Sequence, residues 1–235
     1  MVSAFSFGPF YGVFVPFRPL TRKFSSLNAA SWDLQYRLGF WDYLDGERAG
    51  QGLLKIMQKY VPQASILDLG CGASANLPLV PGTYRHYHGV DISEKAIKRA
   101  RALGRIDTSY ENADILTYVP RQTYDVILLS EVLGHLPEAK ISGFLRRLSG
   151  FLTSDGVILV QIWAGGMNPG LTAAIEGSGL PMVQETNAEP DAGRPRKIVE
   201  QNAGRPRSVF ILRAPGSARP PRATGPFHRS APGRR

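Results

Sequence analysis

The sequence predicts an α/β fold: a doubly wound, mostly parallel sheet of seven strands with helices on both faces. From residue 45 to residue 163, short apolar runs alternate with segments whose apolar residues recur at helical spacing. One run, Tyr124–Ser130, is apolar almost throughout, as expected for a central strand covered on both faces. The first run ends in glycines, and such folds bind their ligands at the ends of their strands.

The elements follow one another in a regular order. A helix over 45–60 is predicted by its apolar spacing and by Pro62, which stops it before the first strand. Strands are predicted over 65–69, 84–90, 109–112, 124–130, 157–163, 182–186 and 208–212. A second helix over 93–103 begins at Ser93, a suitable N-cap, and a third begins at Pro137. Residues 153–156 are expected to form a turn.

The positive charge lies at the C-terminal end. The net charge is +9, yet residues 1–190 contain 17 Lys or Arg and 17 Asp or Glu. Residues 191–235 contain 11 basic and two acidic residues. A protein that follows a nucleic-acid backbone should carry its basic residues on the folded body, so a nucleic-acid partner is not expected. Residues 214–235, rich in Pro, Gly, Arg and Ser, are predicted to be a disordered basic tail.

Residues 1–30 form an aromatic and basic segment interrupted by Pro and Gly, which argues against a secretory signal. We expect an arm that packs on the body, with mitochondrial import as the lesser alternative to a cytoplasmic location. No stretch reaches the ~20 apolar residues of a membrane span. One cysteine excludes an internal disulfide, and the His and Cys spacing predicts no metal site.

Acidic residues and glycines stand where the first three strands end. They are Asp68, Gly70 and Gly72 after the first strand, Asp91 after the second and Asp114 after the third. Glycines let a backbone approach a ligand without an intervening Cβ. A carboxylate at Asp91 can accept both ribose hydroxyls of a nucleoside, and one at Asp114 can accept from an adenine amino group. Ile92 and Ile115 are apolar enough to sandwich the base.

A nicotinamide dinucleotide is the main alternative ligand. Its G-x-G-x-x-G fingerprint presents amides to a pyrophosphate, but here the third position is Ala75. Asp68 stands two residues before the first glycine, where its charge would repel phosphate. A ligand with a sulfonium, an amino group and no phosphate suits that carboxylate, so the charge favours S-adenosyl-L-methionine.

Four motifs together resemble those of the class I S-adenosylmethionine-dependent methyltransferases. They are ILDLGCGAS, YHGVDIS, NADIL and YDVILLSEVLGHLP. Upstream, WDLQYRLGFWDYLDG is similar to the N-terminal element of small-molecule methyltransferases. The resemblance covers about 31–213, which it implies is a methyltransferase domain of the class I fold. It implies methyl transfer to an O or N atom of a small molecule, with specialised metabolism as one setting. Ser74 departs from the commonest motif, which often has a third glycine.

The resemblance also implies roles for individual residues. Gly70 and Gly72 would approach the methionine part of the cofactor, with Cys71 contributing its backbone and Asp68 contacting the amino-acid end. The full cofactor-binding set is Asp68, Gly70, Cys71, Gly72, Asp91, Ile92, Asp114, Ile115 and Ser130.

The loop after the fourth strand offers two candidate catalytic residues, Glu131 and His135. Histidine titrates near neutral pH, which suits a general base, although His135 could instead cap or pack the next helix. Glu131 could contact cofactor or substrate, or only border them. Candidate substrate contacts are the aromatic residues Trp32, Tyr36, Trp41 and Trp163. The three upstream aromatics would form a lid or, equally, a helix packed on the core.

Two other functions stay open. One is an RNA- or protein-directed methyltransferase that uses the basic tail, and the other is a non-catalytic Rossmann-like binding protein. Enzymes that methylate nucleic-acid bases or glutamine usually carry an Asn/Asp-Pro-Pro-Tyr-like loop after the fourth strand. This chain has Ser130 and Glu131 there, which favours a small-molecule acceptor. The sequence sets no oligomeric state.

Overall fold

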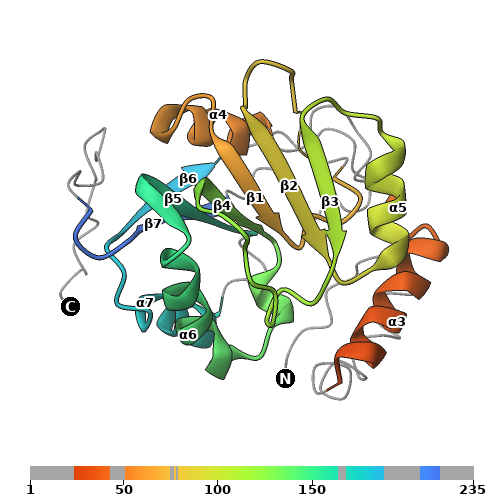
Figure 1. Ribbon diagram of the computed structural model, residues 1–235. Coiled ribbons are helices and arrows are strands. Elements are labelled where there is room, and N and C mark those ends of the chain that lie inside the picture. Colours follow the sequence, from red (N-terminus) through yellow and green to blue (C-terminus); the bar gives the residue numbers. More distant parts are fainter. Residues whose placement is uncertain are drawn as a thin grey trace, which may run out of the picture.

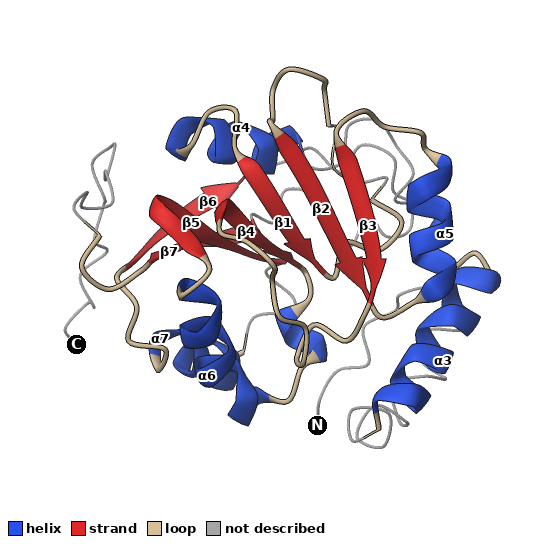
Figure 2. Cartoon of the chain, in the orientation of Figure 1, coloured by secondary structure: helices blue, strands red, loops and turns tan. Residues whose placement is uncertain are grey.

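The computed structural model describes residues 24–42, 51–74, 77, 79–163, 168–187 and 207–217. These residues form one seven-stranded sheet with helices on both faces (Figures 1 and 2). The strand order is β3-β2-β1-β4-β5-β7-β6, and β7 runs antiparallel to both of its neighbours. The remaining pairs are parallel. The predicted fold class, a mostly parallel doubly wound sheet, is therefore confirmed.

The elements lie close to their predicted places. The strands are β1 (Ser65–Leu69), β2 (His86–Asp91), β3 (Thr108–Asn112), β4 (Tyr124–Ser130), β5 (Leu152–Trp163), β6 (Met182–Asn187) and β7 (Arg207–Arg213). The helices are α3 (Ser25–Arg37), α4 (Gln51–Tyr60), α5 (Glu94–Ala102), α6 (Glu138–Ser149) and α7 (Pro169–Glu176), with a short 3-10 helix η3 (Leu133–His135). The sequence had not indicated α7.

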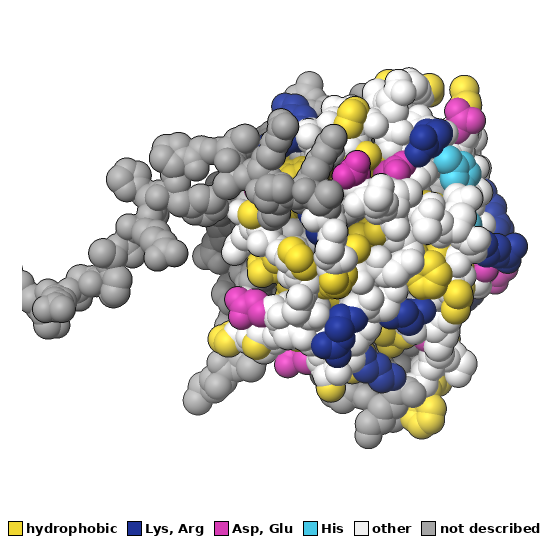
Figure 3. Space-filling model, turned by 60° about the vertical axis from the view of Figure 1, so that its left-hand side comes forward, with side chains coloured by type: hydrophobic (Ala, Val, Ile, Leu, Met, Phe, Trp, Pro, Cys, Tyr) yellow, Lys and Arg dark blue, Asp and Glu magenta, His cyan; other side chains and the backbone are white. Residues whose placement is uncertain are grey.

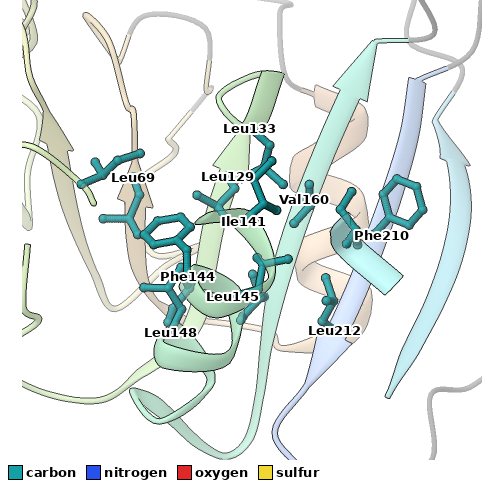
Figure 4. Packing of buried hydrophobic residues seen from close by; sticks show 14 of the residues in the cluster. Leu69, Leu129, Leu133, Ile141, Phe144, Leu145, Leu148, Val160, Phe210 and Leu212 are labelled. Carbon is teal, nitrogen blue, oxygen red and sulfur yellow. The ribbon is translucent and has the colours of Figure 1, made fainter. Parts of the chain in front are cut away.

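Each face of the sheet buries its own apolar layer. On one face, α6 and α7 pack against alternate residues of the strands, and Figure 4 shows Ile141, Phe144 and Leu145 of α6 lying over β4 and β5. On the other face, α4 and α5 cover residues such as Ile66 and Val126. Successive strand residues point to opposite faces, so a strand buried on both sides must be apolar throughout. This explains the composition of β4.

One predicted element is wrong. Residues 153–156, expected as a turn, lie inside β5, which begins at Leu152. Tyr124 pairs with Leu152 whereas Val126 pairs with Val157, so the register shifts between these two pairs. The polar stretch is accommodated by this irregularity, and the Thr153 hydroxyl donates a hydrogen bond of 2.9 Å to Asp125. Residues 153–156 thus continue the strand between its two paired parts, although none of them has a partner in the β4 register.

Helix α3 begins at Ser25 and so crosses residue 30, where the sequence had suggested a boundary between arm and domain. It packs beside α5 at the β3 edge of the sheet (Figure 1). The predicted helix residues 45–50, most of the predicted arm and residues 218–235 of the predicted tail lie outside the described residues.

The described surface carries both signs of charge. On the face drawn in Figure 3, Lys and Arg side chains form small groups among apolar and acidic ones, without a continuous basic surface. No helix within the described ranges is long and apolar enough to cross a membrane. In the same part of the chain, no group of three or more His, Cys, Asp or Glu side chains could hold a metal ion.

Candidate active site

The glycine loop follows β1, which borders the point between β1 and β4 where the strand order reverses. Gly70 and Gly72 both adopt the left-handed backbone conformation, with φ of 82° and 55°. The N–H groups of Gly70 and Cys71 donate to the carbonyl of Val90, which holds the loop against the end of β2. A Cβ at Gly72 would lie 2.4 Å from the Tyr36 hydroxyl. Position 72 therefore requires glycine for two reasons: its left-handed backbone conformation and the lack of space for a Cβ beside Tyr36.

Asp91 joins this loop to the start of α5. Its Oδ2 accepts a hydrogen bond of 2.9 Å from the Gly72 N–H, and its Oδ1 accepts one of 2.8 Å from the Ser93 N–H. The Ser93 hydroxyl accepts from the Ala96 N–H, which confirms the predicted N-cap. Burial raises the pKa of Asp91 to about 6, although its backbone donors oppose the shift. Each carboxylate oxygen has a second lone pair, so both ribose hydroxyls can still be accepted.

Asp68 is the second buried carboxylate of the site, only 4% exposed. Its Oδ2 accepts a hydrogen bond of 2.7 Å from the Tyr87 hydroxyl, which in turn accepts one of 3.1 Å from the Ser74 hydroxyl. Its Oδ1 has no hydrogen-bond partner among the described residues. Burial raises the pKa of Asp68 to about 7, the Tyr87 hydrogen bond opposes that shift, and the negative charge of Asp91 adds to it. A buried carboxylate with an unused oxygen suits a cationic ligand group.

Asp114 lies in the loop after β3, as predicted. Its Oδ1 accepts from the Leu116 N–H at 2.9 Å and its Oδ2 from the Ser25 hydroxyl of α3 at 2.8 Å. Ile92 is half-buried, whereas Ile115 is 6% exposed and packs in the hydrophobic core. Of the two isoleucines expected to sandwich a base, Ile92 therefore presents more of its side chain.

The aromatic residues of α3 lie against the loop that follows β4. The Trp32 ring meets His135 edge-on, with centroids 5.0 Å apart, and lies 5.5 Å from the Trp41 ring. The Tyr36 ring lies 6.4 Å from Trp41. The fold thus brings together three of the four predicted substrate contacts and the predicted base. Trp163 is the last residue of β5, and its side chain lies outside the described part of the chain.

The remaining predicted residues border the same edge. Glu131 has a φ of 59°, unusual for a residue other than glycine, and its N–H donates to the Gln161 carbonyl. Strained residues of this kind cluster at functional sites. Ser130 accepts from the Gln161 side-chain amide at 3.4 Å. The Cys71 thiol is buried and donates to the Gly72 carbonyl, and burial raises its pKa, so a reactive thiolate is disfavoured.

Sequence reasoning missed several residues that support the site. Tyr87 is the first residue of the YHGVDIS motif, but nothing in that motif indicated its hydrogen bond to Asp68. Asp33, on α3, accepts hydrogen bonds from the Ser93 hydroxyl and from the Lys95 N–H. The guanidinium of Arg147, on α6, donates to three carbonyl groups in the loop that carries Asp114. No local pattern in the sequence announces any of these contacts.

Comparisons with known proteins agree with this geometry. Residues 67–158 match a family model described as a methyltransferase domain. The chain is 25% identical over 159 residues to dTDP-3-amino-3,6-dideoxy-alpha-D-glucopyranose N,N-dimethyltransferase of Streptomyces fradiae, covering 64% of this chain and 62% of that protein. It is 28% identical over 103 residues to a probable (S)-tetrahydroprotoberberine N-methyltransferase of Papaver bracteatum, covering 41% of this chain. That match spans only 28% of the Papaver protein.

The fold has a solved counterpart in the N-methyltransferase NodS from Bradyrhizobium japonicum WM9, in complex with S-adenosyl-l-homocysteine. The TM-score is 0.54 at 19% sequence identity, and the likeness covers 69% of this chain and 84% of that chain. At this level of identity the likeness concerns the fold alone.

Proposed function

We propose that this chain, which carries a class I S-adenosylmethionine-dependent methyltransferase domain, transfers the methyl group of that cofactor to a nitrogen or oxygen atom of a small molecule. One observation carries the proposal: two left-handed glycines and the acids Asp68, Asp91 and Asp114 meet at one edge of the sheet, beside the aromatic helix α3. The relatives from Streptomyces and Papaver are named as N-methyltransferases, which favours a nitrogen acceptor.

The described residues fit the cofactor. Asp68 has an unused buried oxygen for an amino group, and the left-handed Gly70 and Gly72 carry no side chain that could shield the loop backbone from a ligand. Asp91 would hold the ribose, Asp114 the adenine amino group, and Ile92 one face of the base. When bound, the cofactor supplies a sulfonium methyl group that is already activated toward a nucleophile.

The residues of the chain then have to hold and align the acceptor. Trp32, Tyr36 and Trp41 would exclude water from the site, and their ring faces suit a cation or another ring. Alignment of two reactants can lower a barrier by roughly 7–11 kcal/mol, so positioning is the main task of the protein. An imidazole nitrogen of His135 would accept the proton of a hydroxyl or ammonium acceptor, while Trp32 holds the ring edge-on.

The cofactor part of the proposal is tested by calorimetric titration with S-adenosylmethionine, S-adenosylhomocysteine and NAD. We expect micromolar binding of the first two ligands, none of NAD, and loss of binding in Asp91→Ala. Glu176→Ala, on the exposed side of α7, is the matched control and should bind as the wild type does. Preference for NAD, or no binding of either methyl-cycle ligand, would contradict the proposal.

The acceptor is tested by methyl transfer to a panel of small amines and hydroxyl compounds. Turnover on amines alone would establish the nitrogen specificity, whereas cofactor binding without turnover on any acceptor would favour a non-catalytic binding protein. We also propose a cytoplasmic enzyme of specialised metabolism. Cell fractionation tests the location.

A further inference from the structure

We propose that Tyr87 and Ser74 are positioning residues, which orient the carboxylate of Asp68 so that its Oδ1 receives the amino group of the cofactor. The inference rests on the proposed function, because it assumes that S-adenosylmethionine occupies the site. Neither residue belongs to the predicted cofactor set, and neither would touch the reacting atoms.

The first observation is a continuous chain of hydrogen bonds inside the protein. Ser74 donates to Tyr87 at 3.1 Å, and Tyr87 donates to Asp68 Oδ2 at 2.7 Å. Ser74 is 1% exposed and Tyr87 is completely buried. Because water is excluded, Tyr87 fixes one carboxylate oxygen and leaves the other, Oδ1, without a partner in the described part of the chain.

The strand register places the tyrosine where it can do this. Tyr87 pairs with Ile66, and Asp68 lies two residues further along β1, so both side chains lie on the same face of the sheet. The Tyr87 ring is packed at a tilt against Tyr110, with centroids 5.9 Å apart. Packing therefore holds the Tyr87 ring in place, and the position of the ring sets the direction from which its hydroxyl donates to Asp68.

The second, independent observation is the backbone of Ser74. Its φ is 57°, in the left-handed region that glycine adopts more readily than serine. The conformation is held by the Ser74 N–H, which donates to the Cys71 carbonyl at 2.9 Å, and by Arg105, which donates to the Ser74 carbonyl at 2.5 Å. A glycine would relieve the backbone but remove the hydroxyl that donates to Tyr87. The serine is thus explained by its side chain.

The alternative is a merely structural role, in which the Tyr87 ring fills the core and Asp68 only accepts the hydrogen bond of the buried Tyr87 hydroxyl. The two roles differ in which part of a ligand they affect. A positioning role concerns only the amino-acid end of the cofactor, whereas damage to the fold would weaken the binding of every part.

The experiment is a calorimetric comparison of two ligands in the full chain. S-adenosylhomocysteine carries the amino-acid end, and 5′-methylthioadenosine keeps the adenine and ribose without it. We expect Tyr87→Phe to weaken S-adenosylhomocysteine binding roughly tenfold, because an Asp68 carboxylate without this hydrogen bond would have to be reoriented for the ligand, and to leave methylthioadenosine binding unchanged. Ser74→Ala should produce the same pattern with a smaller factor.

Tyr84→Phe is the matched control, because it also removes the hydroxyl of a buried tyrosine, which donates to the Ile106 carbonyl and takes no part in the chain from Ser74 to Asp68. It should bind both ligands as the wild type does. Adding Tyr87→Phe to an Asp68→Asn variant should cause no further loss of S-adenosylhomocysteine affinity, because Tyr87 is expected to act through the Asp68 carboxylate. Tyr87 lowers the pKa of Asp68, so the pH midpoint of S-adenosylhomocysteine binding should rise in Tyr87→Phe.

The inference would be overturned if Tyr87→Phe lost equal affinity for both ligands. It would also be overturned if both Tyr87→Phe and Ser74→Ala bound S-adenosylhomocysteine as the wild type does. Either result would leave the proposed function standing. Failure of the unaltered chain to bind S-adenosylhomocysteine and S-adenosylmethionine would overturn the proposed function, and the inference with it.

Discussion

The carboxylate of Asp33 accepts a hydrogen bond of 2.6 Å from the hydroxyl of Ser93, which lies 60 residues further along the chain. The same oxygen accepts from the Lys95 N–H at 3.0 Å. Since the Ser93 N–H donates to Asp91, a single serine connects the aromatic helix α3 to the carboxylate expected to hold the ribose. These hydrogen bonds join α3, which carries Trp32 and Tyr36, to the start of α5.

We therefore expect Asp33→Ala to loosen α3 without unfolding the domain. Amide hydrogen exchange over residues 28–37 should accelerate, because the lost hydrogen bonds are worth about 1–3 kcal/mol in total. Asp42→Ala, which removes only the exposed ion pair with Arg99, is the control and should change exchange little. Unchanged exchange in Asp33→Ala would mean that α3 is held by other contacts.

Gly72→Ala should impair both folding stability and cofactor binding. The new methyl group would have to displace the Tyr36 hydroxyl, in addition to the strain of a left-handed alanine. Gly104→Ala is a close control, because its φ of 59° is similar and nothing lies within 4 Å of its added Cβ. We expect Gly72→Ala to cost about 1–3 kcal/mol more than Gly104→Ala in denaturant unfolding.

Combining Gly72→Ala with Tyr36→Phe should recover much of this difference, because the nearest atom after the hydroxyl is 3.6 Å away. If the double variant is as unstable as Gly72→Ala alone, the contact with Tyr36 is not the cause.

Binding of S-adenosylmethionine should strengthen as the pH rises from 5.5 to 7.5. The pKa of Asp68 is raised to about 7 and that of Asp91 to about 6, so the free protein holds protons that a cationic ligand would expel. Proton release is measured by calorimetry in buffers of different ionisation enthalpy. Asp68→Asn should reduce it, and pH-independent binding by the unaltered chain would contradict this linkage.

The same shifts predict the stability of the ligand-free protein. A carboxyl group whose folded pKa is raised binds its proton more tightly in the folded state, so it contributes stability that is fully present below its unfolded pKa. That contribution is lost as the pH rises from about 4 to about 7, the pKa to which burial raises the Asp68 carboxyl group. Thermal unfolding with and without S-adenosylhomocysteine across this range measures it, and Asp68→Asn should flatten the profile.

His135→Ala should lower kcat by about 10²–10⁴-fold and leave the cofactor Kd unchanged, if His135 accepts the acceptor proton. His86→Ala is the control, because His86 lies on β2 and contacts Ser109. A wild-type kcat in His135→Ala would leave the Trp32 contact as the only role assigned to this residue.

Arg147 should matter more than its neighbour Arg146, although both lie in the last turn of α6. Arg147 donates to the carbonyls of Tyr118, Ile115 and Leu116, whereas Arg146 donates to Gly177 at 3.3 Å. We expect Arg147→Met to lose about 1–3 kcal/mol more stability than Arg146→Met and to weaken adenosine binding. Equal effects in denaturant unfolding and titration would show that the loop holds its shape without Arg147.

Local sequence patterns were enough to predict the sheet and the edge at which the candidate site lies. Apolar periodicity located β4 at its observed bounds, and the carboxyl ends of parallel strands meet at one edge, which brought Asp68, Asp91 and Asp114 together. The N-cap at Ser93 was also predictable, because a cap depends on residues within one turn of helix. These features follow from local patterns and from rules of strand direction.

The side chains that support those acids could not be predicted, because they are brought into contact by packing between separate elements. The Tyr87–Asp68 bond depends on the register of two strands, and the Asp33–Ser93 bond depends on how α3 packs beside α5. The irregular course of β5 through residues 153–156 likewise depends on contacts with β4, such as the hydrogen bond from Thr153 to Asp125. Contacts between separate elements form only where packing brings them within hydrogen-bond distance, and the spacing of residues within one element does not encode that distance.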